Sequence, residues 1–226
     1  MVTGGSSGLG FALAQGLTRR GRRVALLARD AHGLDRAVDR LGEAGAAASG
    51  YACDVSREAE VRNAFSQIAT GGTVRLLFNV AGVGRFGPPE AVSETMIDQV
   101  LGGNLIGLML VTAAALPLLR QAGGGTIVSV LSTAALVGRA NEAVYCAAKW
   151  GARGFMHALR AELEGSPIRT LTVYPGGMRT KFWAKEAGRS PDLSGYMDPD
   201  DVAEHILAVA LDPKSAYVTE MTINRR

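Results

Sequence analysis

The chain has 226 residues, of which 47% are hydrophobic and 20% are charged. These proportions are ordinary for a soluble globular protein and argue against disorder, and the length is most economically one domain, residues 1–226, with a full core. The formal net charge of +3 is small and the arginines are scattered rather than clustered, so we expect no nucleic-acid partner.

Two cysteines, Cys53 and Cys146, are too few for a disulfide framework and lack the spacing of metal ligands. We expect buried thiols, a reducing compartment and no metal. The N-terminus has no basic stretch followed by an apolar core, and the apolar run at residues 105–119 is interrupted and too short to span a bilayer. We therefore expect a cytoplasmic protein with no membrane partner.

The chain opens with a glycine-rich segment, TGGSSGLG at residues 3–10, followed by an amphipathic helix that ends at Gly21. Gly4, Gly8 and Gly10 allow a tight turn, let the backbone approach a pyrophosphate and leave the helix N-terminal amides free to bind its charge. The spacing differs from the commoner G-x-G-x-x-G fingerprint, and alone it could equally be an ordinary turn. Because only two residues precede it, the first strand is either very short or begins upstream.

Strands and helices alternate along the rest of the chain. Apolar runs predict strands at residues 23–28, 46–52, 74–78, 127–131, 168–174 and 216–223, and helical spacing predicts helices at 34–41, 58–68, 93–119, 143–163 and 199–211. This alternation predicts parallel pairing and a three-layer α/β/α sandwich. The irregular segment at residues 178–197 fits a flap over a pocket, or else a surface loop with a few packed aromatic residues.

Polar and small residues follow several predicted strands, at the edge where such sheets bind ligands. Arg29 follows the second strand, where an arginine suits the 2′-phosphate of NADP and an acid suits the ribose of NAD; its neighbour Asp30 keeps NAD open. Asp54 follows the third strand. The sequence NVAG at residues 79–82 follows the fourth, and its small residues would let the backbone pass close to a ribose.

A tyrosine, a lysine and a serine suggest chemistry in the second half of the chain. Ser132 stands where a strand ends, and Tyr145 and Lys149 share a helix face. A nearby ammonium favours the phenolate and lowers the tyrosine pKa, so Tyr145 could protonate a carbonyl oxygen that the Ser132 hydroxyl holds. Taken alone, Tyr-x-x-x-Lys is common by chance. Asn104, in an apolar helix, is either a structural anchor or a group that holds water near a site.

With these motifs, the chain resembles the short-chain dehydrogenase/reductase family, in its NADP-preferring type, along nearly its whole length. TGGSSGLG is similar to the family's cofactor loop, NVAG to its NNAG element, and PGGMRT at residues 175–180 to its P-G-x-x-x-T segment. Asn104, Ser132, Tyr145 and Lys149 stand in the order of its catalytic tetrad. The resemblance implies a Rossmann-like, doubly wound sheet of seven parallel strands in the order 3-2-1-4-5-6-7, and a homodimer or homotetramer.

The resemblance also implies roles for individual residues. Tyr145 would be the general acid or base, and Ser132 would orient the carbonyl. Lys149 would bind the nicotinamide ribose and lower the tyrosine pKa, and Asn104 would hold a water that links Lys149 to solvent. The implied cofactor contacts, besides Tyr145 and Lys149, are Gly4, Ser6, Ser7, Gly8, Leu9 and Gly10 at the pyrophosphate, Arg29, Asp54 and Val55 at the adenosine, Asn79, Ala81 and Gly82 near a ribose, and Pro175, Gly176, Met178 and Thr180 at the nicotinamide.

The sequence departs from the family pattern in three places. Val80 replaces the second asparagine of NNAG, which puts some strand-to-strand anchoring in question, and the first strand is truncated. The tail TEMTINRR differs from the D-G-G ending of many 3-oxoacyl-carrier reductases, which makes a dedicated fatty-acid role less favoured.

The leading expectation is an NADPH-dependent oxidoreductase that reduces a ketone or aldehyde and is reversible as an alcohol dehydrogenase. The alternatives are a 3-oxoacyl-thioester reductase acting on a carrier protein or CoA, and an NADP-binding protein without catalysis. The pocket walls should come from residues 84–88, 134–142 and the flap. The expected apolar lining is Leu136, Val137, Phe182 and Trp183, and the expected polar contacts are Arg139 or Glu142.

Overall fold

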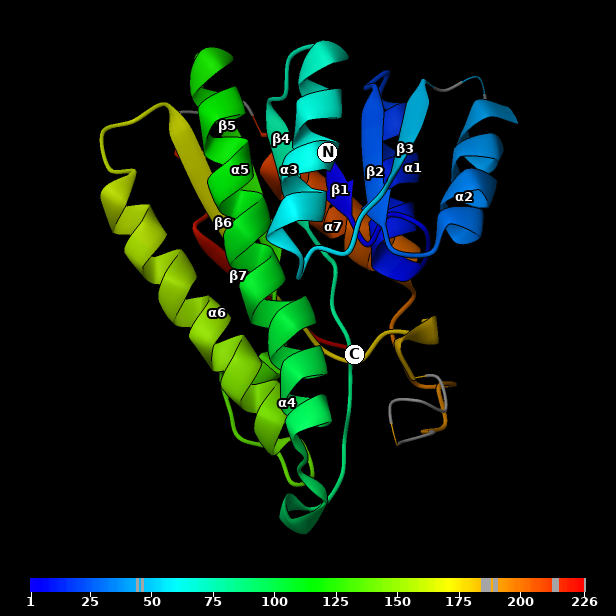
Figure 1. Cartoon of the computed structure of the whole chain (residues 1–226), viewed down its shortest axis with the longest axis vertical. Helices are drawn as coiled ribbons and strands as arrows, with labels where there is room; N and C mark the ends of the chain where they lie inside the picture. The colour runs from blue at the N-terminus through cyan, green and yellow to red at the C-terminus, as the bar shows by residue number, and fades with distance from the viewer. Residues whose placement is uncertain (44, 46, 184–187, 189–190, 213–215, 226) are drawn as a thin grey trace.

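Seven strands form one parallel sheet in the order β3-β2-β1-β4-β5-β6-β7 (Figure 1). This order, seen in a computed structural model that describes residues 1–43, 45, 47–183, 188, 191–212 and 216–225, confirms the expected topology. The strands are Val2–Thr3 (β1), Val24–Ala28 (β2), Ala48–Ala52 (β3), Leu76–Asn79 (β4), Gly125–Val130 (β5), Ile168–Pro175 (β6) and Glu220–Ile223 (β7).

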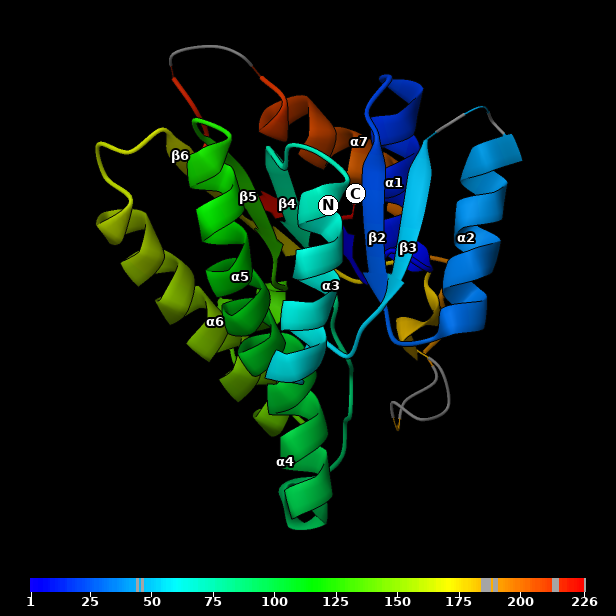
Figure 2. The ribbon, with the colours of Figure 1, turned by 45° about the horizontal axis from the view of Figure 1, so that its top comes forward.

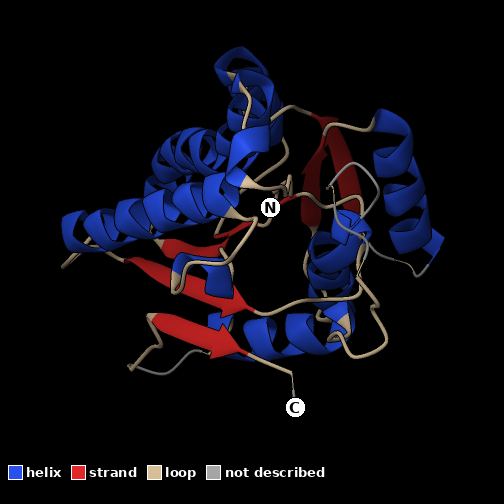
Figure 3. Ribbon diagram, turned by 90° about the horizontal axis from the view of Figure 1, so that it is seen from below, coloured by secondary structure: helices blue, strands red, loops and turns tan. Residues whose placement is uncertain are grey.

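Helices cover both faces of the sheet, which lies between them when the molecule is seen from below (Figure 3). One face carries α3 (Glu58–Thr70), α5 (Gly107–Gln121) and α6 (Ala143–Glu162), and the other carries α1 (Gly8–Arg19), α2 (Ala31–Glu43) and α7 (Pro199–Ala210). Each face has its own hydrophobic cluster. A sheet that is buried on both sides explains why its strands read as continuous apolar runs.

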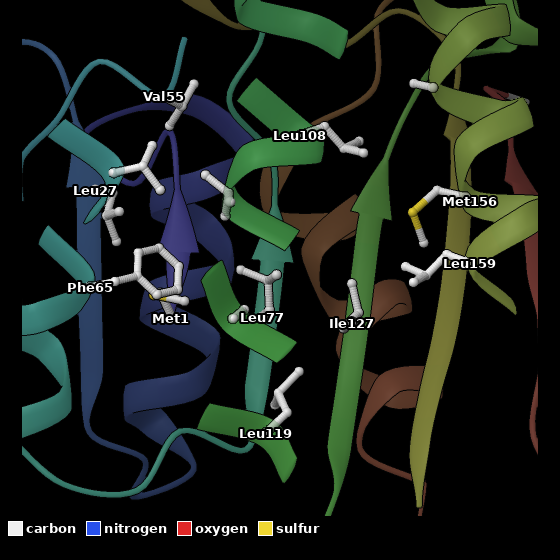
Figure 4. Close-up of a cluster of buried hydrophobic side chains, with 14 of the residues drawn as sticks. Met1, Leu27, Val55, Phe65, Leu77, Leu108, Leu119, Ile127, Met156 and Leu159 are labelled. Atoms are coloured by element: carbon white, nitrogen blue, oxygen red, sulfur yellow. The ribbon is translucent and has the colours of Figure 1, made fainter. Parts of the chain in front are cut away.

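The cluster under α5 and α6 fixes the elements that carry the functional residues. Leu77 of β4 and Ile127 of β5 are fully buried, and they meet Leu119 of α5 and Met156 of α6 (Figure 4). Burying a side chain of this size contributes about 1.5–3 kcal/mol. The amino end of α6 is therefore held in place against the carboxyl ends of the strands.

The first strand is as short as expected, and its threonine does more than pair with neighbouring strands. Val2 pairs with both β2 and β4. The Thr3 hydroxyl donates to Phe78 O at 3.4 Å and accepts from the backbone N–H groups of Val80 and Ala81 at 2.9 and 3.0 Å. The anchoring that Val80 put in question is thus supplied by Thr3.

The predicted helix at 93–119 is interrupted in the structure. It consists of α4 (Glu94–Leu101), a π-helical segment (Gly102–Ile106) and α5, which run on as one rod beside α6 (Figure 2). Ser93 caps the rod as expected, because its hydroxyl accepts from Met96 N at 3.2 Å. Asn104 lies inside the π-helical segment, a feature that is frequent at functional sites.

This rod, Glu94–Gln121, is by length and composition the one helix in the described part of the chain that could cross a membrane. Its residues Val111, Ala115 and Leu119 are buried in the core cluster. Core helices of soluble proteins often have this length and composition, so the feature is weak support for a membrane span.

Several boundaries differ from the predicted ones. β7 begins at Glu220 rather than at residue 216, and α2 extends three residues further towards the N-terminus than predicted. The predicted flap at 178–197 contains a short 3-10 helix, Lys181–Trp183, while its residues 184–187 and 189–190 lie outside the described residues. Cys53 and Cys146 are buried free thiols, as expected.

Candidate active site

A cleft of about 1080 Å³ runs along the carboxyl edge of the sheet. It lies at the topological switch point between β1 and β4, where successive strands stop being added on one side of β1 and start being added on the other. Open parallel sheets bind ligands at this point. Its volume slightly exceeds the usual range of small-molecule pockets, so it is large enough for an extended ligand such as a dinucleotide. The predicted site residues that line it are Gly4, Ser6, Ser7, Gly8, Leu9, Gly10, Arg29, Asp54, Val55, Ala81, Gly82, Asn104, Ser132, Tyr145, Lys149, Pro175, Gly176, Met178 and Thr180.

Asn79 is the exception among the predicted cofactor contacts. Its side chain is buried, and its amide donates to Thr112 Oγ1 at 2.9 Å and to Ser129 Oγ at 3.3 Å. Asn79 therefore ties β4 to α5 and β5 beneath the cleft through its side chain.

The glycine-rich turn after β1 fits a pyrophosphate. Gly4 has a φ of +65°, and a Cβ at Gly10 would overlap the carbonyl oxygen of Gly4, so the turn needs glycine at both places. Ser7 precedes α1 without making a side-chain cap, which leaves the first amides of this helix available. Such free amides at a helix N-terminus bind phosphate groups.

Charged residues of both signs line the cleft beside the ends of β2 and β3, namely Arg29, Asp30, Asp54 and Arg57. Arg29 is exposed and lines the cleft. The Asp30 carboxylate folds back over the first turn of α2, where a Cβ on Gly33 would lie 2.5 Å from its Oδ2. Burial disfavours the Asp54 carboxylate, but hydrogen bonds from Ser56 and the nearby guanidinium groups of Arg29 and Arg57 outweigh burial and lower its pKa.

Tyr145, Lys149 and Ser132 meet in the cleft. Tyr145 and Lys149 lie one turn apart near the start of α6, and the Lys149 Nζ is 5.6 Å from the centroid of the Tyr145 ring. This confirms that the two side chains share a face. Ser132 follows the end of β5, where its Oγ accepts from Ala134 N at 3.1 Å. The packing of β5 and α6 thus places the Ser132 hydroxyl, the Tyr145 phenol and the Lys149 amine in one part of the cleft.

The pKa of Tyr145 is raised, not lowered as Lys149 led us to expect. Burial is the main cause, since Tyr145 is 7% exposed and packs against Phe86 and Phe182. A hydrogen bond with Ser132 acts in the opposite direction but is outweighed. Burial also lowers the pKa of Lys149 to about 8. Tyr145 is therefore a protonated phenol at neutral pH, which suits a proton donor.

Asn104 brings an unsatisfied polar atom to the site. Its Nδ2 donates to Val83 O at 2.8 Å and Val100 O at 2.9 Å, while its buried Oδ1 has no hydrogen-bond partner among the described residues. A Cβ on Gly82 would lie 2.7 Å from this Oδ1 and 3.8 Å from Lys149 Nζ, so Gly82 leaves room between the two groups. A buried acceptor of this kind fits a bound water or ligand.

Aromatic rings form the far end of the cleft, beyond Tyr145. Phe86 packs on Tyr145 with ring centroids 5.5 Å apart, and stacks on Trp183 at 5.7 Å. Phe182 lies 5.8 Å from Tyr145, and Trp183 lies 5.6 Å from Tyr196. Phe182 and Trp183 line the cleft as expected, whereas the predicted Leu136 and Val137 are not among its lining residues.

Some lining residues were not predicted. Asp98 and Gln99 come from α4, and Asn224 and Arg225 follow β7. The Arg225 guanidinium lies 6.0 Å from the ring centroid of Tyr196. No motif marks Asn224 and Arg225, because the tail reaches the cleft only through the pairing of β7 with β6.

Known proteins are similar to this chain in sequence and in architecture. Residues 1–190 match the family described as short chain dehydrogenase. The chain is 36% identical to D-threitol dehydrogenase of Mycolicibacterium smegmatis, over 94% of this chain and 85% of that protein, and 39% identical to a 3-oxoacyl-[acyl-carrier-protein] reductase of Bos taurus, over 96% and 92%. Alcohol dehydrogenase from Thermococcus sibiricus, solved with 5-hydroxy-NADP, has a TM-score of 0.90 and 27% identity over 98% of this chain and 94% of that chain.

Each of these likenesses extends over most of both proteins, and they agree with the order of the motifs, the strand topology and the tetrad in the cleft. The chain belongs to the short-chain dehydrogenase/reductase family of oxidoreductases.

Proposed function

We propose that the protein is an NADPH-dependent carbonyl reductase, reversible as an alcohol dehydrogenase. The observation that carries the proposal is the convergence of Ser132, Tyr145 and Lys149 in a cleft that also contains a free helix N-terminus. The nicotinamide ring, when bound, supplies the hydride. The remaining chemistry belongs to the protein.

In this proposal Tyr145 gives its proton to the carbonyl oxygen. Burial keeps its phenol protonated, and the hydrogen bond with Ser132 orients the hydroxyl. Ser132 also donates to the oxygen of the substrate as charge develops there. Lys149, whose ammonium lies beside Tyr145, binds the ribose hydroxyls and stabilises the phenolate left after proton transfer. Asn104 Oδ1 would accept from a water that carries the next proton to this pair.

The preference for NADP over NAD rests on charge at the adenosine end. Arg29 is exposed at the end of β2. Asp30 also lines the cleft, but its Oδ2 lies against Gly33 of α2, so we expect the guanidinium to meet a 2′-substituent. The Thermococcus relative was solved with an NADP derivative. We expect NADPH to be used at least about tenfold more efficiently than NADH, which corresponds to about 1.4 kcal/mol.

The test is oxidation of NADPH and NADH with a panel of ketones and aldehydes by the wild type and by Tyr145→Phe. The proposal expects turnover of at least one carbonyl compound by the wild type and a loss of about 10²-fold or more in the variant. Equal rates in the two proteins would end it. Binding of NADPH without turnover of any carbonyl would instead support an NADP-binding protein without catalysis.

A 3-oxoacyl-thioester reductase is the second candidate, favoured by the bovine relative and by basic residues at the mouth of the cleft, Arg139 and Lys181. It predicts that acetoacetyl-CoA is turned over with a higher kcat/KM than simple ketones. It also predicts that Arg139→Ala raises KM for the thioester only.

We also propose a cytoplasmic homodimer or homotetramer. The long helices α4 and α6 expose apolar side chains, among them Ile97 and Trp150. Sedimentation equilibrium measures the assembly, and a monomer at micromolar concentration would contradict this part of the proposal.

A further inference from the structure

Glu142 is a buried acid in the catalytic cleft that the proposed reaction does not use. It precedes α6, is 6% exposed and lines the cleft with Tyr145 and Lys149. The intervals of three and seven residues place Glu142, Tyr145 and Lys149 in one row on the helix surface. Lys149 is at one end of the row, beside Asn104. Glu142 is therefore at the other end, beyond Tyr145.

The carboxylate of Glu142 acts on the reacting hydroxyl through space. Its charge contributes to the raised pKa of Tyr145, after the larger effect of burial and that of the Ser132 hydrogen bond. Side chains three residues apart on a helix have Cβ atoms about 5–6 Å apart. A substrate whose carbonyl oxygen contacts Tyr145 therefore has its adjacent carbons within reach of Glu142.

Among the described residues, the aromatic rings that pack around Tyr145 offer no comparable acceptor. Phe86 and Phe182 carry no polar side-chain atom, and the indole N–H of Trp183 donates to Met178 O at 3.0 Å. A polar substituent near the substrate carbonyl would lose its hydration against these rings without gaining a partner. Beside Glu142 it gains an acceptor.

A carboxylate accepts hydrogen bonds, and a hydroxyl group donates them. Arg139 lines the same cleft, and its charge acts on Tyr145 in the opposite direction to that of Glu142. The hydrogen bond, rather than net charge, therefore favours hydroxy aldehydes and hydroxy ketones at this place.

We propose that Glu142 is a specificity-determining residue that accepts a hydrogen bond from a substrate hydroxyl next to the carbonyl, so that the enzyme prefers hydroxylated aldehydes and ketones and, in reverse, vicinal diols. This inference rests on the proposed function. A purely structural role is the rival account, because an acid at a helix N-terminus stabilises the helix dipole. The two accounts differ in how removal of the acid affects matched substrates.

The experiment compares 1-hydroxy-2-butanone with 1-methoxy-2-butanone, which keeps the oxygen and its inductive effect but cannot donate a hydrogen bond. The kcat/KM ratio of hydroxy to methoxy substrate is measured for the wild type, Glu142→Gln and Glu142→Met. We expect the ratio to fall about tenfold in Glu142→Met and less in Glu142→Gln, whose amide oxygen still accepts. The change should be mainly in KM, because the hydroxyl is bound in both ground and transition states.

Asp98→Asn is the matched control, since Asp98 is an exposed acid that lines the same cleft. It should leave the ratio unchanged. A second readout is binding of 1,2-butanediol by calorimetry, which should weaken in Glu142→Met while binding of 2-butanol does not.

The inference is overturned if Glu142→Met lowers kcat/KM for both ketones equally, or lowers only thermal stability, as a structural role requires. Its failure differs from failure of the proposed function. If only the role of Glu142 is wrong, the wild type reduces both ketones and the ratio does not change between variants. If the proposed function is wrong, the wild type reduces no carbonyl compound, and both proposals are refuted.

Discussion

Replacing Lys149 with methionine should stabilise the protein while abolishing catalysis. Burial lowers the pKa of Lys149 from 10.5 to about 8, and each pKa unit corresponds to about 1.4 kcal/mol between the two protonation states. Holding the buried ammonium therefore costs about 3 kcal/mol at neutral pH. Methionine keeps an unbranched stem but loses the 3.5 Å contact from Nζ to Val130 O and the ammonium contact with the Tyr145 ring at 5.6 Å. We expect a net gain of about 2 kcal/mol, or about 4–8 °C in Tm for a chain of this size.

The gain should depend on pH in a defined direction. Below pH 8 Lys149 is charged in both the folded and the unfolded chain, so the full cost of burying the charge is present. Between pH 8 and 10.5 the folded protein holds the neutral amine while the unfolded chain stays protonated. Wild-type stability therefore rises with pH in this window, and the difference between the two proteins shrinks.

The assay is urea denaturation of both proteins, without added cofactor, at pH values from about 6 to about 10. Lys181→Met is the control, because Lys181 lines the same cleft but is exposed, and it should change stability by less than about 0.5 kcal/mol. The reasoning is refuted if Lys149→Met is no more stable than the wild type at pH 7, or if its gain is the same at every pH.

Three further substitutions probe other parts of the account. Thr3→Val leaves the N–H groups of Val80 and Ala81 without their acceptor, and should lower the free energy of unfolding by about 2 kcal/mol; an unchanged denaturation curve would contradict this. Asn79→Ala should lower stability by about 1–3 kcal/mol and leave the Kd for NADPH within about threefold, because the side-chain amide bonds beneath the cleft; a large rise in Kd would contradict a purely structural role of this side chain. Arg29→Ala should raise the Kd for NADPH about tenfold with little effect on NADH, so equal losses for the two would remove the charge argument.

The alternation of strands and helices and the order of the motifs allowed the fold and the tetrad residues to be predicted from the sequence. Strands that are buried on both faces are continuous apolar runs, and helices that cover a sheet have apolar residues with a period of 3.6. Both patterns can be recognised from the hydrophobicity of the sequence alone. The tetrad was predicted from the resemblance to the family's order of motifs, and the spacing alone predicted that Tyr145 and Lys149 share a helix face, which the structure confirms. For such local relations, spacing is enough.

Features that depend on distant contacts were missed or misjudged. The π-helical turn around Asn104 has no period of its own, and it is held by a bond to Val83, 21 residues away. The side-chain partners of Asn79 on α5 and β5 are 33 and 50 residues away, so the sequence gives no local signal of its structural role. The direction of the Tyr145 pKa depends on packing by Phe86 and Phe182, which sequence spacing does not reveal.

The central claim is that the Tyr145 hydroxyl delivers the proton to a carbonyl oxygen during reduction by bound NADPH. The most direct measurement is the rate of NADPH oxidation in a single turnover of the wild type and Tyr145→Phe, with the Kd for NADPH determined for each protein. The account predicts a similar Kd for both and a rate at least about 10²-fold lower in the variant. Equal single-turnover rates with equal cofactor binding would contradict it.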